Sequence, residues 1–110
     1  MKIDQEDYED LTLIIPQDSL VGDDAAQLEA VLTTVLSDSP RDVAVDASRI
    51  KQIDSRGLEV LVDTTEQLIR GGRVLKLVAA DETLREILEL TELASLFEYA
   101  DCIDYGIESI

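Results

Sequence analysis

The run Asp54-Ser55-Arg56-Gly57-Leu58 combines a small hydroxyl with an acid, a base and a glycine, a set suited to receiving an anion. This run joins the end of an apolar strand pattern to the start of a helical pattern, so it places a small hydroxyl, Ser55, at a helix N-terminus. Free N–H groups and the positive end of the helix dipole favour an anion there. Ser55 could therefore accept a phosphate and act as a switch. It could also be a plain cap, in which Asp54 or Ser55 accepts from those N–H groups.

Composition argues against most other chemistry. The 110 residues include no histidine, and Cys102 is the only cysteine, which excludes an internal disulfide, an ordinary zinc site and a histidine-activated nucleophile. No Gly-Lys-Ser/Thr run of the Walker type occurs, so a nucleotide hydrolase is the least favoured function. Asp54 and the pair Asp23-Asp24 are better explained as helix caps than as acid/base or metal groups. We therefore expect no enzymatic activity, no metal and no cofactor.

The formal net charge of −16 limits the kinds of partner. Nucleic acid backbones and anionic lipid surfaces are themselves anionic, so the charge argues against both. After Lys2, every basic residue falls between Arg41 and Arg85, which leaves both ends of the chain acidic. The acidity could serve solubility alone, or it could favour docking to a basic protein surface.

Length and hydropathy predict one domain spanning residues 1–110. No stretch approaches the roughly 18 consecutive apolar residues that a membrane span needs, and residues 1–6 lack the apolar run of a signal peptide. We expect a cytoplasmic protein without direct membrane insertion.

The first half of the chain predicts two strands and a helix. Residues 3–8 form a weak edge strand, and residues 11–15 form a clear strand that ends at Pro16. Residues 17–22 are expected as a loop. Asp23 or Asp24 can cap a helix that ends in residues 37–40 and has one apolar face, made by Ala25, Leu28, Val31, Leu32, Val35 and Leu36.

The middle of the chain predicts a buried strand over residues 42–47. Ile50 and Ile53 then carry the chain over the end of the sheet into the motif. A second helix runs from Ser55 to Gly71-Gly72, which end it in the usual C-terminal manner. Its apolar stripe consists of Leu58, Leu61, Val62, Thr65, Leu68 and Ile69.

The last third predicts a buried strand over residues 74–79 and a helix that Asp81 caps. The apolar side of this helix is carried by Leu84, Ile87, Leu88 and Thr91. Residues 93–97 form a hydrophobic turn, and the tail from Tyr99 to Ile110 adds a short strand or helical turn. This order of elements indicates an α/β domain whose later strands run parallel. We expect a mixed four- to five-stranded sheet with helices mainly on one face.

Three segments also resemble a known family. The run from Asp42 to Leu61, which contains the motif, is similar to the signature of STAS domains, a family that includes bacterial anti-sigma factor antagonists and cytoplasmic domains of sulphate transporters. Residues 71–77 and 84–93 resemble that family's next strand and third helix, in the same order and spacing. The resemblance covers roughly residues 10–105, and it implies a STAS-like single domain.

In the antagonist branch, the serine after the motif aspartate is phosphorylated by an anti-sigma factor that is also an ATP-dependent serine kinase. The resemblance implies that Ser55 is this phosphoacceptor. The unphosphorylated protein would bind the anti-sigma factor and free the sigma factor, and a separate serine phosphatase would reset the phosphorylated form. Arg49 and Lys51 lie close enough in sequence to pair with the phosphate, as does Arg56.

The same resemblance implies a partner-binding surface, made by Asp54, Arg56, Gly57, Leu58 and Glu59 together with the loop before the first helix. In that loop the family's usual aspartate aligns with Val21, or with Asp23 if the alignment shifts by two residues. A different function remains open on the same surface. The chain could be a docking subunit of a transporter, chemotaxis or other signalling complex that works without phosphorylation.

Overall fold

The sheet is organised around one long strand, β2 (Leu11–Leu20), in a computed structural model that describes residues 2–38 and 41–101. β1 (Lys2–Asp7) pairs antiparallel with β2 along one edge, which confirms the expected edge strand. β3 (Asp42–Asp46) pairs parallel with β2 on the other side. β2 therefore has neighbours on both sides, as a central strand does.

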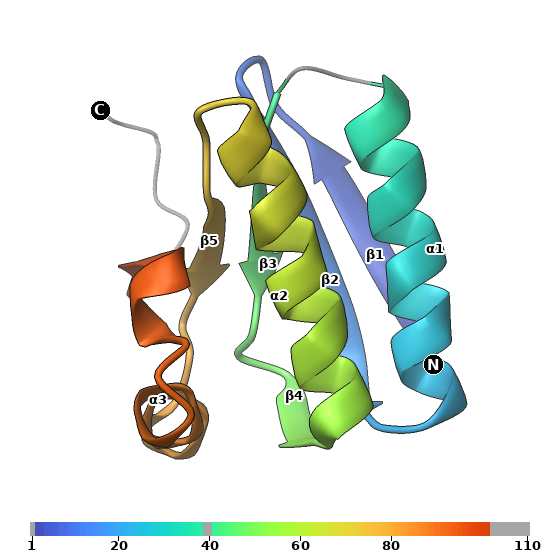
Figure 1. Cartoon of the computed structure of the whole chain (residues 1–110). Helices are drawn as coiled ribbons and strands as arrows, with labels where there is room; N and C mark the ends of the chain where they lie inside the picture. The colour runs from blue at the N-terminus through green and yellow to red at the C-terminus, as the bar shows by residue number, and fades with distance from the viewer. Residues whose placement is uncertain (1, 39–40, 102–110) are drawn as a thin grey trace.

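β5 (Leu75–Val78) and β6 (Phe97–Ala100) continue the parallel part of the sheet, giving the order β1-β2-β3-β5-β6 (Figure 1). A sixth strand, β4 (Ile50–Ile53), lies off this path and pairs parallel with β2 alone. The mixed sheet confirms the fold class. The expectation that Ile50 and Ile53 only carry the chain past the sheet was wrong, because the far half of β2 offers them a second strand to pair with.

The expected end of β2 at Pro16, with a loop over residues 17–22, was also wrong. Proline lacks an N–H and usually interrupts a sheet ladder. Pro16 lies opposite Ile3 of β1, between the part of β2 that pairs with β3 and the part that pairs with β4. The strand continues because Pro16 falls where β2 changes its parallel partner.

Two helices lie side by side over one face of the sheet: α1 (Asp23–Asp38) and α2 (Ser55–Arg70) (Figure 1). Their inner side chains pack on the sheet in one hydrophobic cluster, which includes Leu28, Leu32, Leu61 and Leu68 from the helices and Ile14, Val43, Val45, Leu75 and Leu77 from the strands. The helical face expected over residues 25–36 is confirmed. Asp23 and Asp24 lie inside the first turn of α1.

The buried face of α2 differs from the expected stripe. Val60 and Thr64 are buried although the stripe left them out, whereas Ile69 is 43% exposed. Val60 and Thr64 line the same crevice as Thr33 of α1. The face is shifted because α2 packs against a helix as well as against the sheet, which periodicity alone does not reveal.

α3 (Glu82–Leu90) begins as expected, since the Oδ1 atom of Asp81 accepts from the N–H of Leu84 at 2.9 Å. A short 3₁₀ helix, η1 (Ala94–Leu96), leads into β6, which starts within the expected turn because Phe97 pairs with Leu75. Residues 102–110 of the predicted tail element lie outside the described residues. Among the helices described, none is long and apolar enough to cross a membrane.

One buried hydroxyl ties α2 to two other elements. Thr65 donates to the Leu96 carbonyl at 2.7 Å and accepts from the Leu75 N–H at 3.0 Å, so it satisfies two backbone groups. The neighbouring Thr64 is also buried, but its hydroxyl donates only within α2, to Val60 at 2.8 Å. That carbonyl also accepts in the helix ladder.

We expect Thr65→Val to lower the free energy of unfolding by about 2 kcal/mol, because it leaves the buried Leu75 N–H and the part-buried Leu96 carbonyl without this partner. Thr64→Val should cost less than about 1 kcal/mol, since the Val60 carbonyl keeps its helical bond. Urea unfolding followed by circular dichroism measures both variants. Equal losses would show that the link between elements adds nothing to stability.

Candidate functional site

The motif lies at the end of the sheet where β2 and β4 end and α1 and α2 begin. β2 leads through Val21 and Gly22 into α1, and β4 leads through Asp54 into α2. The last residue of β4, Ile53, pairs with the last residue of β2, Leu20, so the two helix starts are held next to each other. We call the surface formed by residues 21–24 and 51–59 the motif surface.

The Asp54 carboxylate joins the two helix starts. Its Oδ1 atom accepts from the Gly57 N–H at 3.0 Å, which caps α2, and its Oδ2 atom accepts from the Gly22 N–H at 3.0 Å. Gly22 adopts a φ of 54°, a left-handed conformation that glycine reaches without strain. The Asp54 backbone adds a third tie, because its N–H donates to the Leu20 carbonyl at 3.2 Å.

The N–H groups of Gly57 and Gly22 hold the pKa of the Asp54 carboxyl below its usual value, because they stabilise the ionised form. Asp54 is therefore the anion that occupies this helix end. Of the two caps left open by the sequence, the structure selects Asp54.

Gly57 lets α2 approach the end of β2 closely. A Cβ atom at this position would lie 2.5 Å from the Leu20 carbonyl oxygen and 2.7 Å from Cγ1 of Ile53, distances that real Cβ atoms do not show. Gly57 is itself buried. Gly57 therefore positions the start of α2 and offers no side chain to a partner.

Ser55 is the first residue of α2 and is exposed, as are Arg56 and Glu59. Leu58 is half-buried against the main hydrophobic cluster. Asp54 directly precedes Ser55, and the first turn of α2 contains no further acidic residue. An exposed hydroxyl at this point can be reached by a modifying enzyme.

The loop before α1 brings both of its candidate residues to the motif surface. Val21 is half-buried beside Ile53, with which it lines a groove, and Asp23 is exposed in the first turn of α1. Gly22 stands between them and bonds to Asp54, a role that sequence reasoning missed. The sequence does contain a hint of this role, because a glycine directly before Asp23-Asp24 is typical of a turn that leads into a helix.

The three basic residues near the motif, Arg49, Lys51 and Arg56, lie on different elements or have different neighbours. Arg56 lies in the first turn of α2, and Lys51 lies on β4 in the groove lining. Arg49 donates from Nη1 to Oε1 of Gln17 at 3.2 Å, which ties it to β2. Of the three, Arg56 is the one next to Ser55 in sequence.

The chain belongs to the STAS domain family, whose model matches residues 2–104, and this confirms the resemblance found in the sequence. An anti-sigma-B factor antagonist of Staphylococcus aureus (strain NCTC 8325 / PS 47) is 30% identical over 70 residues, which cover 64% of this chain and 65% of that protein. The chain thus matches a little under two thirds of that relative's length.

Two solved structures share the fold. An anti-sigma factor antagonist from Mycobacterium paratuberculosis is 25% identical, with a TM-score of 0.82 and coverage of 94% of this chain and 87% of that one. The Bacillus cell fate determinant SpoIIAA, solved in its phosphorylated form, is 16% identical, with a TM-score of 0.72 and coverage of 90% and 91%.

Asp54 and Asp81 both cap helices, and Asp54 also accepts from a second segment, the Gly22 N–H. Comparing the two tests this second bond, which we call the Asp54 bridge. Asp54→Ala should lower the urea midpoint of unfolding more than Asp81→Ala, because Asp54 binds Gly22 in addition to capping its helix. The folded pKa of Asp54 is lowered, so its contribution is complete above its unfolded pKa, about 3.9, and is lost as pH falls through the folded value. The difference between wild type and Asp54→Ala should therefore shrink below about pH 4. A difference that stays constant through that range would contradict the bridge.

Gly57→Ala should lower the free energy of unfolding by about 2 kcal/mol, since the overpacking outweighs alanine's better helix propensity. Gly71→Ala is the control, because an added Cβ there meets its nearest atom at 3.5 Å, an ordinary contact. It should change stability by less than about 0.5 kcal/mol. Thermal or urea unfolding compares the two, and a neutral Gly57→Ala would refute the close approach.

Proposed function

We propose that this protein is an anti-sigma factor antagonist that works by partner switching, with Ser55 as the phosphorylation site. The observation that carries the proposal is an exposed serine at the first position of α2, directly after the aspartate that organises the motif surface. Two relatives named as anti-sigma factor antagonists support the assignment, and SpoIIAA, a protein of the same fold, has been solved in a phosphorylated form.

A phosphate on Ser55 would change the surface and leave the fold intact. Ser55 is exposed and contributes nothing to the hydrophobic clusters. Phosphorylation adds a charge of about −1.5 to −2. Because the Asp54 carboxylate already accepts from the Gly57 N–H and lies beside the site, it repels the new anion. The phosphate therefore remains on the outer surface, where a docked partner would meet it.

The partner is an anti-sigma factor with ATP-dependent serine kinase activity, which binds the unphosphorylated chain and is released by the phosphate. A serine phosphatase completes the cycle. The contacts are made by side chains that the motif surface presents, namely Arg56, Leu58, Glu59, Val21 and Asp23. Asp54 and Gly57 fix their positions. The net charge of −16 favours a basic docking surface on the partner.

The test incubates the chain with ATP and a cognate kinase-type anti-sigma factor, sought among the neighbouring genes. Phosphate should enter at Ser55 and should be lost in Ser55→Ala. In calorimetry, Ser55→Asp should weaken binding to that partner by about tenfold or more, because it places a charged carboxylate at a point of close contact, where binding must strip its water. Ser95→Asp adds the same charge at an exposed position of η1 and should bind within about twofold of wild type.

Incorporation of phosphate at another residue, or none at all, would refute the switch. Binding that is equal for Ser55→Asp and Ser95→Asp would also contradict it. That result would favour the alternative function, a docking subunit of a transporter, chemotaxis or other signalling complex that is indifferent to charge at Ser55.

A further inference from the structure

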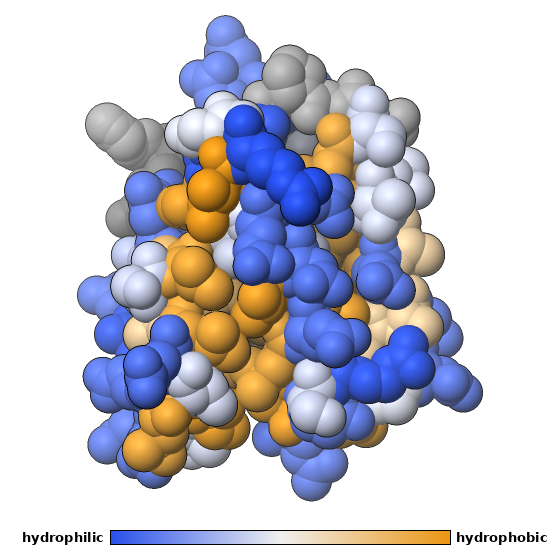
Figure 2. Space-filling model, in the orientation of Figure 1, coloured by the Kyte–Doolittle hydropathy of each residue, from blue (hydrophilic) through white to orange (hydrophobic). Residues whose placement is uncertain are grey.

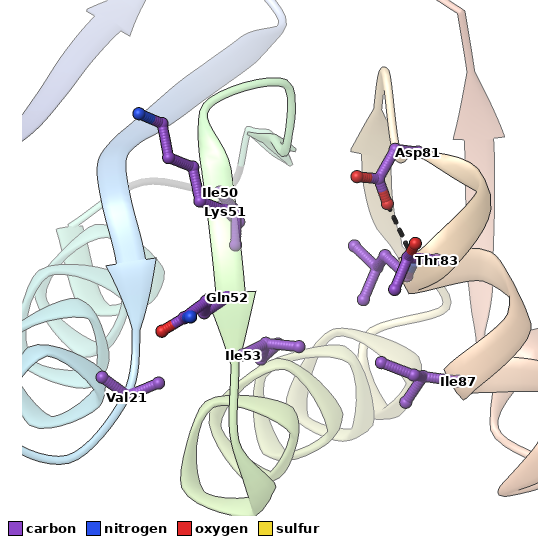
Figure 3. A pocket seen from close by; sticks show the side chains of 9 residues that line it. Val21, Ile50, Lys51, Gln52, Ile53, Asp81, Thr83 and Ile87 are labelled. Carbon is purple, nitrogen blue, oxygen red and sulfur yellow. Dashed lines mark hydrogen bonds between the residues drawn. The ribbon is translucent and has the colours of Figure 1, made fainter.

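A groove runs between β4 and the first turns of α3. It has a volume of about 400 Å³ and is lined by Val21, Ile50, Lys51, Gln52, Ile53, Asp81, Thr83, Leu84 and Ile87. Ile53 and Ile87 point into it from opposite sides, while Lys51 and Asp81 stand on its two walls (Figure 3). On the face that Figure 2 shows, apolar surface also gathers between α3 and α2.

One wall of this groove is the edge of a strand. β4 pairs with β2, and among residues 2–38 and 41–101 it has no second strand neighbour. An edge strand presents backbone N–H and C=O groups that another chain can pair with. Lys51 and Gln52, in the middle of β4, are exposed.

The edge is open because β5 ends early. β3 and β4 lie one after the other along the same side of β2 (Figure 1), and β5 pairs with β3 as far as Asp46 and Val78. Ala79 then adopts a φ of 57°, which turns the chain away into α3. A segment paired with β4 would lie in line with β5, in the position that β5 would occupy if it were longer. α3 would lie on the other side of that segment.

The chemistry of the occupant follows from the two walls. An extended segment can pair with the β4 edge and place every second side chain against Ile53, Leu84 and Ile87. A helix could cover the apolar side chains but would leave the backbone groups of the edge unpaired. The groove lining carries one base, Lys51 on β4, and one acid, Asp81 at the start of α3. Glu82 and Glu86 are exposed on the first turns of α3 outside that lining. The whole chain carries −16, which favours basic side chains at the alternate positions and opposes a second copy of this chain.

We propose that the groove binds an extended segment of the protein partner by strand addition to β4, and that this segment alternates apolar with basic residues. The proposal deepens the proposed function and rests on it for the identity of the partner, because β4 leads directly through Asp54 to Ser55. The groove gives the partner a second point of attachment, one that a phosphate on Ser55 does not occupy.

The probe is a short capped peptide of alternating Val and Lys, titrated into the full ¹⁵N-labelled chain. Amide shifts should concentrate at Lys51, Gln52 and Ile53 and in the first turns of α3. Ile87→Glu should weaken binding by about tenfold or more, since it replaces apolar surface that the peptide covers. Leu90→Glu makes the same kind of change at a 77% exposed residue of α3 outside the groove lining, and it should bind within about twofold of wild type.

Thr83→Arg supplies a second variant at an exposed rim position, where a fold defect is not expected, and it should repel the basic peptide. A peptide with the same side chains but N-methylated valines should bind more weakly by about tenfold, because it cannot donate to the strand edge. Equal binding of both peptides, shifts away from the groove, or concentration-dependent shifts without peptide would overturn the proposal. The peptide assay does not involve Ser55, so failure of the groove and failure of the phosphorylation switch are observed separately.

Discussion

The arrangement of the motif surface depends on the Asp54 carboxylate, which accepts from the Gly57 N–H with one oxygen and from the Gly22 N–H with the other. These two bonds connect the starts of α1 and α2 at the end of the sheet. The connection is possible because Gly57 allows α2 to approach Leu20 and because Gly22 adopts a left-handed turn. Together with the pairing of Leu20 with Ile53, these bonds fix Val21 and Asp23 relative to Ser55.

The residues that fix the geometry of the motif surface differ from those exposed on it. Asp54 and Gly57 hold the geometry, and Ser55 and Arg56 are free to meet solvent or a partner. A charge added at Ser55 is therefore separated from the core by an acid that already caps the helix. Under the proposed function, this separation would let the docking surface change while the fold keeps its stability.

Much of this could be predicted from the sequence. The helix starts at Asp54 and Asp81 follow from capping chemistry, and the family follows from an ordered set of motifs. The length of β2 and the existence of β4 could not, because Pro16 is tolerated only through the change of strand partner and because four residues give too short a pattern. Nor could the bond from Asp54 to Gly22, which joins residues 32 positions apart. Long-range contacts of this kind leave no local periodicity.

Phosphorylation at Ser55, as proposed, alters the motif surface and leaves the core unchanged. The most direct measurement compares ¹⁵N-labelled chain with and without phosphoserine at position 55, by amide shifts, hydrogen exchange and partner binding. We expect shifts confined to residues 21–24 and 51–59, unchanged protection of the Leu75 amide that donates to Thr65, and loss of partner affinity. Lost protection at Leu75, or a partner that binds both forms equally, would contradict it.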